Sequence, residues 1–502
     1  MTNLKKLAEL LKVTSYKKID GLQNIEILDV TADSRQVKEG SLFICLVGAH
    51  VDGHQFIASA IEKGAKAIIV SKAVCAPEGV SVVYVDDTRK AMEDIVPFFF
   101  DYPAEKMRMI ALTGTNGKTT TTHVISHILE KAGYKTGVIG TIHALIGSKE
   151  LPTHNTTPDV IDLERLLYQM VEENVTHVCM EVSSHALIMG RVAGCEFDNA
   201  IFTNLTEDHL DFHKTMDNYA SAKALLFQMV SSEDQRKAKK DAWVNADDPY
   251  AVVMEKAVDT KVCALHTYSM EDENAELYAF DSQFTGKSSG FKVKYRGQIY
   301  EIETQLAGRF NIYNTLAAMG ASLSEGILMK DIVTSMKTFQ SVPGRFELIN
   351  EGQSFTVVVD YAHTPDGLEK ILTTAREITG GRVIVVFGCG GDRDKLKRPI
   401  MGRIAAENAD IAIVTSDNPR TEDPNVIVSE VAAGVKEIKS QKPSLTYEVI
   451  VDRRSAIQRA IALASGNDIV LIAGKGHEDY QILKDKTIHF DDREEARNAL
   501  KG

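Results

Sequence analysis

Cysteine and long apolar runs are scarce in this chain of 502 residues. Its six cysteines are scattered, without a CxxC pair or a zinc-type spacing, which excludes a disulfide-stapled or structural-zinc protein and indicates reduced thiols. No apolar run approaches the roughly 18 residues that span a bilayer. The first residues, MTNLKK, lack the apolar core of a signal peptide. We therefore expect a cytoplasmic protein with no membrane partner.

The chain also lacks an excess of positive charge. Lys and Arg number 57 against 70 Asp and Glu, so the formal net charge is −13. This acidic balance argues against a broad nucleic-acid-binding surface. A hydrophobic fraction of 44% with 25% charged residues is ordinary for a globular protein. At roughly 150 residues per domain, the length predicts about three domains.

The last third of the chain repeats a strand–loop–helix pattern. The predicted strands cover 357–359, 383–387, 411–414, 445–451 and 469–473, and the predicted helices follow Pro365 and cover 400–408, 426–439 and 454–464. This alternation is typical of a Rossmann-like, doubly wound parallel sheet. In such folds the loops at the carboxyl ends of the strands form the ligand crevice.

The remaining two thirds also favour an α/β fold. A strand at 109–112, a polar loop at 113–119 and a helix closed by Gly133 begin the central part, and a strand at 175–181 follows. Residues 271–290 are polar and indicate a loop with weak strands around it. The first hundred residues predict a small α/β domain. Proline-containing segments near residues 102 and 342 give the predicted domains 1–102, 103–341 and 342–502.

One loop carries a phosphate-binding pattern. Residues 114–119 read GTNGKT between a strand and a helix, so backbone N–H groups and the helix N-terminus would face phosphates. Lys118 would reach the β- and γ-phosphates, and the Thr119 hydroxyl would face Mg²⁺. The first glycine of the usual P-loop is replaced by Leu112. An ordinary strand-to-helix turn is the alternative interpretation.

Other polar residues are ambiguous when taken singly. Glu181 could be a solvated strand end, residues 204–213 a polar surface turn, and Lys223 a surface lysine. Arg393 and Arg420 offer guanidinium forks that pair bidentately with carboxylates. We interpret their neighbours Lys395, Lys397 and Arg398 as a solvated basic face.

Together these segments resemble the Mur ligase family, ATP-dependent amide-forming enzymes of peptidoglycan synthesis. The central motifs are TGTNGKTTT (113–121), NTTP (155–158), EVSSHAL (181–187), NLTEDHLDFH (204–213), NADDP (245–249) and GRFNIYN (308–314). The later motifs are PGRFE (343–347), DYAHTPD (360–366), GCGGDRDKLK (388–397), DNPR (417–420) and GKGHE (474–478). The resemblance covers essentially the whole chain. It implies a small N-terminal domain for a uridine nucleotide, a central P-loop domain for ATP and a C-terminal domain for an incoming amino acid.

The resemblance also implies roles for particular residues. ATP would meet Gly114, Thr115, Asn116, Gly117, Lys118, Thr119, Thr120, Asn311, Asn314, Arg345 and Asp360. The UDP-muramoyl-dipeptide would meet Ala32, Ser34, the segment 49–51, Asn155, Thr156, Thr157, Ser183, Met189 and Arg191, with Met189 standing where the family often has Gln. Mg²⁺ would be held by Thr119, Glu181, His209 and Lys223, the last as a carbamate. The implied catalytic residues are Lys118, Glu181, His209 and Lys223. The acceptor would meet Arg393, Asp417, Asn418, Pro419, Arg420, Gly474 and Glu478.

The implied reaction joins meso-2,6-diaminopimelate to UDP-N-acetylmuramoyl-L-alanyl-D-glutamate through an acyl phosphate. Diaminopimelate is lysine with one more carboxylate, and Arg420 offers that carboxylate a bidentate cation. L-Lysine as acceptor, a ligase resembling folylpolyglutamate synthase, and a P-loop switch that forms no bond are the alternatives. We expect a monomer that needs no nucleic acid.

Overall fold

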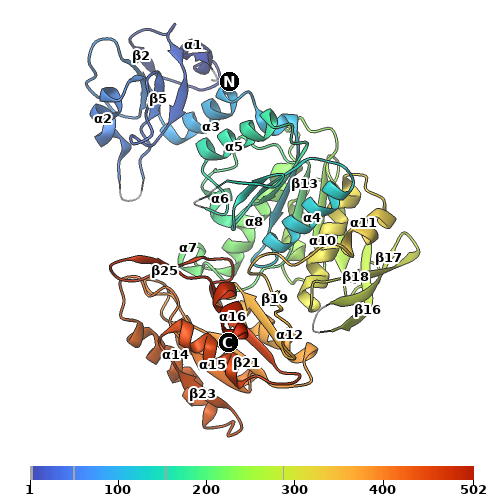
Figure 1. Ribbon diagram of the computed structural model, residues 1–502. Helices are drawn as coiled ribbons and strands as arrows, with labels where there is room; N and C mark the ends of the chain where they lie inside the picture. Colours follow the sequence, from blue (N-terminus) through green and yellow to red (C-terminus); the bar gives the residue numbers. More distant parts are fainter. Residues whose placement is uncertain (1–3, 49–50, 152, 154, 286–287) are drawn as a thin grey trace.

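The computed structural model describes residues 4–48, 51–151, 153, 155–285 and 288–502. Its elements form three α/β parts that follow one another along the chain, with the central part between the other two (Figure 1). This confirms the predicted three-domain α/β architecture, while the boundaries at residues 102 and 341 remain predictions. Among the described residues, no helix is long and apolar enough to cross a membrane.

The N-terminal part is built on a five-stranded sheet in the order β2-β7-β6-β5-β4. The strands are β2 (Lys18–Asp20), β7 (Ser81–Tyr84), β6 (Ala65–Val70), β5 (Ser41–Ile44) and β4 (Asp29–Thr31). Helices α1 (Leu7–Leu10) and α3 (Thr88–Phe99) cover one face, and η1 (Gly53–Phe56) with α2 (Ile57–Glu62) lies at the other. The short strands β1 (Lys5–Lys6) and β3 (Glu26–Ile27) pair with each other. Helix η2 (Pro103–Lys106) leads into the central part.

The central sheet has eleven strands among the described residues, and its parallel core has the order β9-β12-β8-β13-β14-β15. These strands are β9 (Thr136–Ile139), β12 (His177–Glu181), β8 (Arg108–Thr113), β13 (Asn199–Phe202), β14 (Asp241–Asn245) and β15 (Ala264–Ser269). The hairpin of β10 (Ala144–Ile146) and β11 (Lys149–Leu151) extends the sheet beyond β9. Apolar residues on both faces are buried, as expected for parallel strands covered by helices on each side.

Two layers of helices enclose this sheet. One face packs against α4 (Lys118–Lys131), α10 (Arg309–Ser324) and α11 (Met329–Met336). The other packs against α5 (Val160–Glu172), α8 (Met216–Val230) and α9 (Ala251–Ala257). The short helices α6 (Ser184–Ile188) and α7 (Leu210–His213) occupy loops at the carboxyl ends of β12 and β13. Figure 1 shows α4 and α10 side by side on one face.

The interpretation of residues 271–290 as a loop with weak strands was wrong. They contribute to an antiparallel extension made of β16 (Leu277–Phe284), β17 (Ser289–Tyr295) and β18 (Gln298–Thr304). In β16, Leu277 and Ala279 are buried, whereas the other residues are partly exposed or, as at Asp281 and Gln283, exposed. The half-solvated face explains the polar composition.

The C-terminal part has a six-stranded sheet in the order β19-β20-β24-β21-β22-β23. The strands are β19 (Glu347–Ile349), β20 (Thr356–Asp360), β24 (Ile469–Ala473), β21 (Val383–Phe387), β22 (Ile411–Val414) and β23 (Thr446–Val449), and all but β19 are parallel. Helices α12 (Pro365–Ile378), α13 (Lys397–Asn408) and α14 (Pro424–Lys439) cover one face, and α15 (Arg453–Leu463) and α16 (Asp492–Lys501) cover the other. A hairpin of β25 (Tyr480–Ile482) and β26 (Thr487–His489) follows β24. The predicted doubly wound sheet is therefore confirmed.

Candidate active site

A cavity of about 790 Å³ lies where loops at the carboxyl ends of the central and C-terminal strands meet. The central part contributes the P-loop residues 115–120, Glu181, His209 and Asn314. The C-terminal part contributes Arg345, Asp360 and residues along most of α12. Of the residues predicted for ATP, only Gly114 and Asn311 do not line the cavity.

Glycine is required at both ends of the P-loop. Gly114 and Gly117 have φ angles of 150° and 89°, and a Cβ atom at either would overlap a neighbour: Thr203 Oγ1 at the first and Asn314 Oδ1 at the second. The segment that follows β13 holds the loop from behind. The Asn204 side chain accepts from the Asn116 N–H at 3.0 Å and donates to the Asn116 carbonyl oxygen at 3.0 Å. The loop is thus fixed before a nucleotide arrives.

Lys118 and Asn314 have the surroundings of phosphate-site residues. The Lys118 ammonium donates to the carbonyl oxygens of Gly114 and Thr115 at 2.7 and 2.9 Å, and burial lowers its pKa. Asn311 lies behind Asn314 and accepts from its amide at 3.0 Å. Asn311 therefore orients Asn314, and its direct contact with ATP stays a prediction.

Arg345 reaches across the cavity to the first turn of α4. Its guanidinium donates to Thr119 Oγ1 at 3.2 Å and lies over the Tyr361 ring, 4.6 Å from the ring centre. The buried Nε of Arg345 has no hydrogen-bond partner among the described residues. Asp360 is buried, and burial raises the pKa of its carboxyl group although Arg345 opposes the shift. An unpaired guanidinium N–H beside a P-loop fits an anionic ligand such as a triphosphate.

Glu181 ends β12 inside this cavity, not as a solvated strand end. Its side chain is buried, and its two oxygens accept from the backbone N–H and the hydroxyl of Thr141 at 2.9 and 3.0 Å. The Thr141 hydroxyl also contacts Thr156 Oγ1 at 3.1 Å. Thr141 was not identified from the sequence, because it belongs to none of the recognised motifs.

Lys223 is not a surface residue. It is 1% exposed on α8, its amine donates to the Gly114 carbonyl oxygen at 2.8 Å, and it lies 4.5 Å from the centre of the Tyr219 ring. Burial, followed by the nearby Lys118 ammonium, lowers its pKa well below the usual range. The neutral, nucleophilic form of the amine is therefore more accessible than in an exposed lysine.

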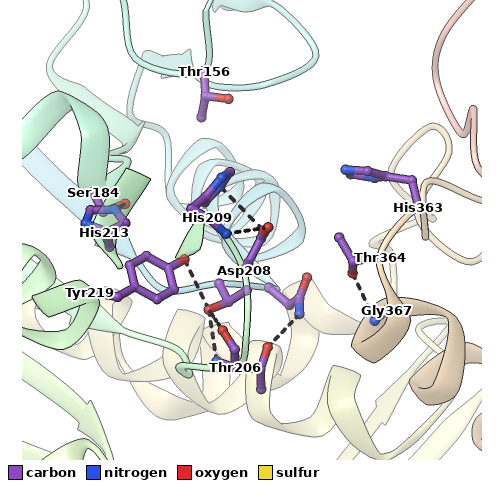
Figure 2. Close-up of polar contacts among 12 residues, drawn as sticks. Thr156, Ser184, Thr206, Asp208, His209, His213, Tyr219, His363, Thr364 and Gly367 are labelled. Carbon is purple, nitrogen blue, oxygen red and sulfur yellow. Dashed lines mark hydrogen bonds and ion pairs between the residues drawn. The ribbon is translucent and has the colours of Figure 1, made fainter. Parts of the chain in front are cut away.

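His209 extends from the loop after β13 towards the cavity. It has a φ of 55°, stands beside Asp208 and faces His185, with 4.9 Å between the two ring centres. Figure 2 shows His209 and Asp208 between Tyr219 on one side and His363 of the C-terminal part on the other. Burial lowers the pKa of His209, so it is a neutral nitrogen donor at pH 7.

The predicted metal ligands provide a partial donor set. No group of three His, Cys, Asp or Glu side chains placed to hold a metal occurs in the described part of the chain. Glu181 and His209 line the cavity together with Thr119, so a cation here would need further oxygen ligands from phosphates or a carbamate. Mg²⁺ is commonly held by one or two carboxylates plus substrate phosphates, and the donor set fits that pattern.

The residues predicted for the muramoyl-dipeptide lie near the carboxyl end of β12. Thr157 Oγ1 accepts from the Ser183 N–H at 3.1 Å, and Arg191 donates to the Thr157 carbonyl oxygen at 3.1 Å. Arg191 also contacts the Met189 sulfur at 3.9 Å, while its buried Nε finds no hydrogen-bond partner in the part of the chain that the structure describes. Asn155 is exposed on the same loop.

The predicted uridine residues lie apart from this cluster. Ala32 and Ser34 follow β4 of the N-terminal sheet, and the Ser34 carbonyl oxygen accepts from Lys63 at 2.9 Å. Val51 is 52% exposed, whereas residues 49 and 50 lie outside the described residues. The uridine assignment stays a prediction.

The predicted acceptor residues come together on three loops of the C-terminal sheet. The Asn418 amide donates to Glu478 Oε2 at 2.9 Å, and a Cβ atom at Gly474 would lie 2.5 Å from Asp417 Oδ2. Arg420 follows the buried Pro419 and donates to the Gly391 carbonyl oxygen at 2.9 Å.

Two arginines meet at the glycine-rich loop after β21. A Cβ atom at Gly390 would lie 2.8 Å from Arg420 Nη1 and 4.0 Å from Arg393 Cγ. Arg393 is exposed. The Arg393 guanidinium donates to the Asp392 carbonyl oxygen at 2.9 Å, so both arginines lie beside the glycine-rich loop, and their contact with a carboxylate stays a prediction.

The interpretation of Arg398 as part of a solvated basic face was wrong. Arg398 is fully buried and pairs with Glu422 at 2.8 Å and Glu430 at 2.6 Å. Its charge ties α13 to α14. Lys395 is exposed, as predicted, and Lys397 is partly exposed.

Asp366, the last residue of the DYAHTPD motif, joins the two halves of the cavity. One carboxylate oxygen accepts from the Asn116 amide at 2.7 Å, the Thr206 hydroxyl at 2.9 Å and the Lys370 ammonium at 2.9 Å. The motif identified the residue, but no pattern in the chain indicates that it contacts the P-loop.

Comparisons with known proteins agree with this geometry. Three family models match: "Mur ligase family, catalytic domain" at residues 26–99, "Mur ligase middle domain" at 112–322, and "Mur ligase, glutamate ligase domain" at 344–476. UDP-N-acetylmuramoyl-L-alanyl-D-glutamate--2,6-diaminopimelate ligase 1 of Clostridium acetobutylicum is 44% identical over 99% of both chains. The ligase of that name, without the numeral, from Geobacillus thermodenitrificans is 46% identical over 95% of this chain and 96% of its own.

Solved structures give the same result. A structure of a UDP-N-acetylmuramoyl-L-alanyl-D-glutamate--2,6-diaminopimelate ligase has a TM-score of 0.70 and 33% identity, covering 100% of this chain and 99% of its own. The MurF ligase of Thermotoga maritima in complex with ADP shares the fold, with a TM-score of 0.61 and 15% identity over 89% of this chain and 93% of its own. With the P-loop, the paired sheets and full-length relatives in agreement, the chain belongs to the Mur ligase family.

Proposed function

We propose that this protein is an ATP-dependent ligase that joins meso-2,6-diaminopimelate to the D-glutamate γ-carboxylate of UDP-N-acetylmuramoyl-L-alanyl-D-glutamate, a step in peptidoglycan precursor synthesis. The observation that carries the proposal is the arrangement of one cavity. A P-loop lies on one side, and Arg345, Asp360 and residues of α12 from the C-terminal part lie on the other. The loops with Arg420 and Glu478 follow β22 and β24 of the same C-terminal sheet, outside the lining of this cavity. Relatives named for this reaction match along the whole chain.

In the first step, the γ-carboxylate of D-glutamate attacks the γ-phosphorus of ATP, and ADP leaves. Lys118 and Arg345 stand where they can neutralise charge on the transferring phosphoryl group. Asn204 keeps the P-loop backbone in place. Phosphorylation is needed because direct attack of an amine on a carboxylate would have to expel oxide, a very poor leaving group.

In the second step, the neutral amine of the acceptor attacks the acyl carbon, the C–O bond to phosphate breaks, and phosphate leaves as the amide forms. The amine gives up its proton in this step. The enclosing loops limit the access of water to the acyl phosphate.

Mg²⁺ is the cation that this donor set suits best, with Thr119, Glu181, His209 and a carbamate on Lys223 as its protein ligands. When bound, it would supply positive charge beside the phosphates. The burial of Lys223, which lowers its pKa, supports the carbamate, because an amine must be neutral to add to CO₂. The addition forms an N–C bond and releases one proton.

Arg420 supports diaminopimelate over L-lysine. The two acceptors differ by one carboxylate, and a bidentate guanidinium recognises that group. The Asp417 and Glu478 carboxylates offer sites for an ammonium group. The protein would act as a monomer in the cytoplasm, where ATP and the uridine nucleotide are available.

The purified protein with ATP, Mg²⁺ and the UDP-muramoyl-dipeptide, given diaminopimelate, L-lysine or neither, tests the proposal. Mass spectrometry of the nucleotide product should show the tripeptide with diaminopimelate and little with lysine. Efficient lysine addition would overturn the acceptor assignment. ATP hydrolysis that needs neither substrate would favour a switch.

A further inference from the structure

We propose that Lys475 is a positioning residue that holds Asn418 and Glu478 in the geometry that receives the acceptor amino acid. This inference rests on the proposed function, because it assigns the acceptor to the loops after β22 and β24. Lys475 is the lysine of the GKGHE motif, and it is not among the residues predicted to contact the acceptor.

Lys475 uses its ammonium group entirely within the protein. Its side chain is fully buried, and Nζ donates to the Tyr480 carbonyl oxygen at 2.6 Å, Asn418 Oδ1 at 3.0 Å and Glu478 Oε2 at 3.4 Å. A buried ammonium carries three donors, and here each has an acceptor. The lysine therefore acts through its neighbours and does not itself meet the substrate.

The contact with Lys475 determines which way the Asn418 amide points. Asn418 Oδ1 accepts from both Lys475 Nζ and the Ile482 N–H, the latter at 2.9 Å. Because two donors face the oxygen, the amide nitrogen is directed the other way, where it donates to Glu478 Oε2 at 2.9 Å. One buried cation thus fixes an amide and a carboxylate of the acceptor site together.

Lys475 also balances charge beneath the site. Burial opposes ionisation of Asp417, but Arg453 and Lys475 overcome this effect and hold its pKa below the usual range. Burial raises the pKa of Glu478, and Lys475 opposes that rise. Removing the lysine would leave the buried Asp417 and the partly buried Glu478 with one cation fewer, which favours protonation of Glu478.

Several elements present titratable groups to Glu478. The charged or titratable side chains that interact with it are Lys475, Asp417, Arg453, Tyr361 and Tyr480. Of the cations in this set, Lys475 is the one hydrogen-bonded to Glu478, and Arg453 is engaged by Asp492 through two hydrogen bonds. Arg453 is therefore poorly placed to replace the lysine.

The test compares Lys475→Met and Lys475→Gln with the wild-type enzyme by steady-state kinetics. We expect the KM for diaminopimelate to rise at least about tenfold in Lys475→Met, with a smaller rise in Lys475→Gln, whose amide can still donate. The KM values for ATP and the UDP-muramoyl-dipeptide should stay within about twofold. Lys484→Met, on the exposed turn after β25, is the matched control and should change none of the three.

A pH profile distinguishes the loss of a positioning contact from general damage to the folded enzyme. Loss of the cation should move the acidic limb of kcat/KM for diaminopimelate to higher pH in Lys475→Met, because Glu478 then protonates more readily. Acyl-phosphate formation without acceptor can be measured by positional isotope exchange in ATP. Its rate in the variant should stay close to that of the wild type. If Lys475→Met is not recovered folded, the same measurements on Lys475→Gln decide the question.

An unchanged KM for diaminopimelate, or an equal rise in all three KM values, would overturn the inference. Failure of the wild-type enzyme to use diaminopimelate would instead overturn the proposed function. The two failures are therefore distinguishable.

Discussion

Arg420 lies on the loop after β22 with a φ of 53°. This left-handed conformation is uncommon for a residue with a side chain. The guanidinium is held by the carbonyl oxygen of Gly391, and the missing side chain of Gly390 leaves room for it. Lysine at this position would keep the charge but lose the planar fork that matches a carboxylate.

We predict that Arg420→Ala lowers the preference for diaminopimelate over L-lysine by about 100-fold, because a charge-assisted bidentate contact is worth roughly 1.5–3 kcal/mol. Arg420→Lys should retain part of the preference. The measurement is the ratio of kcat/KM for the two acceptors. Arg403→Ala, which removes a partly exposed arginine of α13 paired with Glu437, is the control. A ratio unchanged by Arg420→Ala would show that another group selects the acceptor.

His266 contributes to the stability of the fold. It stacks on Trp243 at 4.6 Å and lies between Asp241 at 3.0 Å and Glu276 at 2.5 Å. Burial lowers its pKa, but hydrogen bonds with the two carboxylates outweigh this effect, so its pKa is raised. Its stabilising effect is fully present below the unfolded pKa of about 6.5 and is lost as pH rises through the higher folded value.

We therefore expect His266→Gln to lower the Tm clearly at pH 6 and much less at pH 9. The expected loss at pH 6 is on the order of 1 kcal/mol. Thermal unfolding at the two pH values measures the difference. His489→Gln is the control, since its pair with Glu494 is exposed and contributes little. A loss that is equal at both pH values would contradict the ionic explanation.

At the scale of elements, α13 and α14 pack closely through two glycines. A Cβ atom at Gly402 would overlap the Val431 carbonyl oxygen, and one at Gly434 would overlap the Pro399 carbonyl oxygen. Arg398 adds its buried ion pairs to the same interface. The loop with Arg393 leads into α13, and the loop with Arg420 leads into α14. The spacing of the two helices therefore positions the acceptor site.

We predict that Gly402→Ala destabilises the protein by about 1–3 kcal/mol despite the better helix propensity of alanine, since the added methyl must push the two backbones apart. The KM for the acceptor should rise as well. Chemical denaturation and steady-state kinetics measure the two effects. Gly380→Ala is the control, because a Cβ atom there meets nothing within 4 Å. A neutral or stabilising Gly402→Ala would contradict the close packing.

The elements also show what sequence patterns can predict. Strand β21 was predicted at its observed bounds, because Val383–Phe387 is a short β-branched run between helices. The strands β16 to β18 were missed because their exposed faces carry polar residues. Arg398 was misplaced because its partner Glu422 is 24 residues away, and local composition does not reveal such pairs.

At the scale of the whole molecule, the active site depends on contact between the central and C-terminal parts. Asp366 accepts from Asn116 of the P-loop and from Thr206, and Arg345 reaches Thr119. The Asn116 and Asp366 contact joins residues 250 positions apart. Motifs could therefore name most of the site, but only the fold brings its two halves together.

We expect Asp366→Ala to lower kcat/KM for ATP about 10- to 100-fold, because small misplacements of reacting groups are costly. Small-angle X-ray scattering should show a broader distribution of interatomic distances as the C-terminal part moves more freely. Asp485→Ala, on the exposed turn after β25, serves as the control. Unchanged kinetics together with an unchanged scattering profile would show that Asp366 does not hold the two parts together.

An isotope experiment tests the proposed ligation most directly. The UDP-muramoyl-dipeptide is prepared with ¹⁸O in the γ-carboxylate of D-glutamate and is incubated with ATP, Mg²⁺ and diaminopimelate. Attack of this carboxylate on ATP, followed by attack of the amine on carbon, requires the released phosphate to carry one oxygen from the labelled carboxylate. Labelled phosphate formed in step with the tripeptide is the predicted result, and unlabelled phosphate accompanying the same product would contradict the acyl-phosphate route.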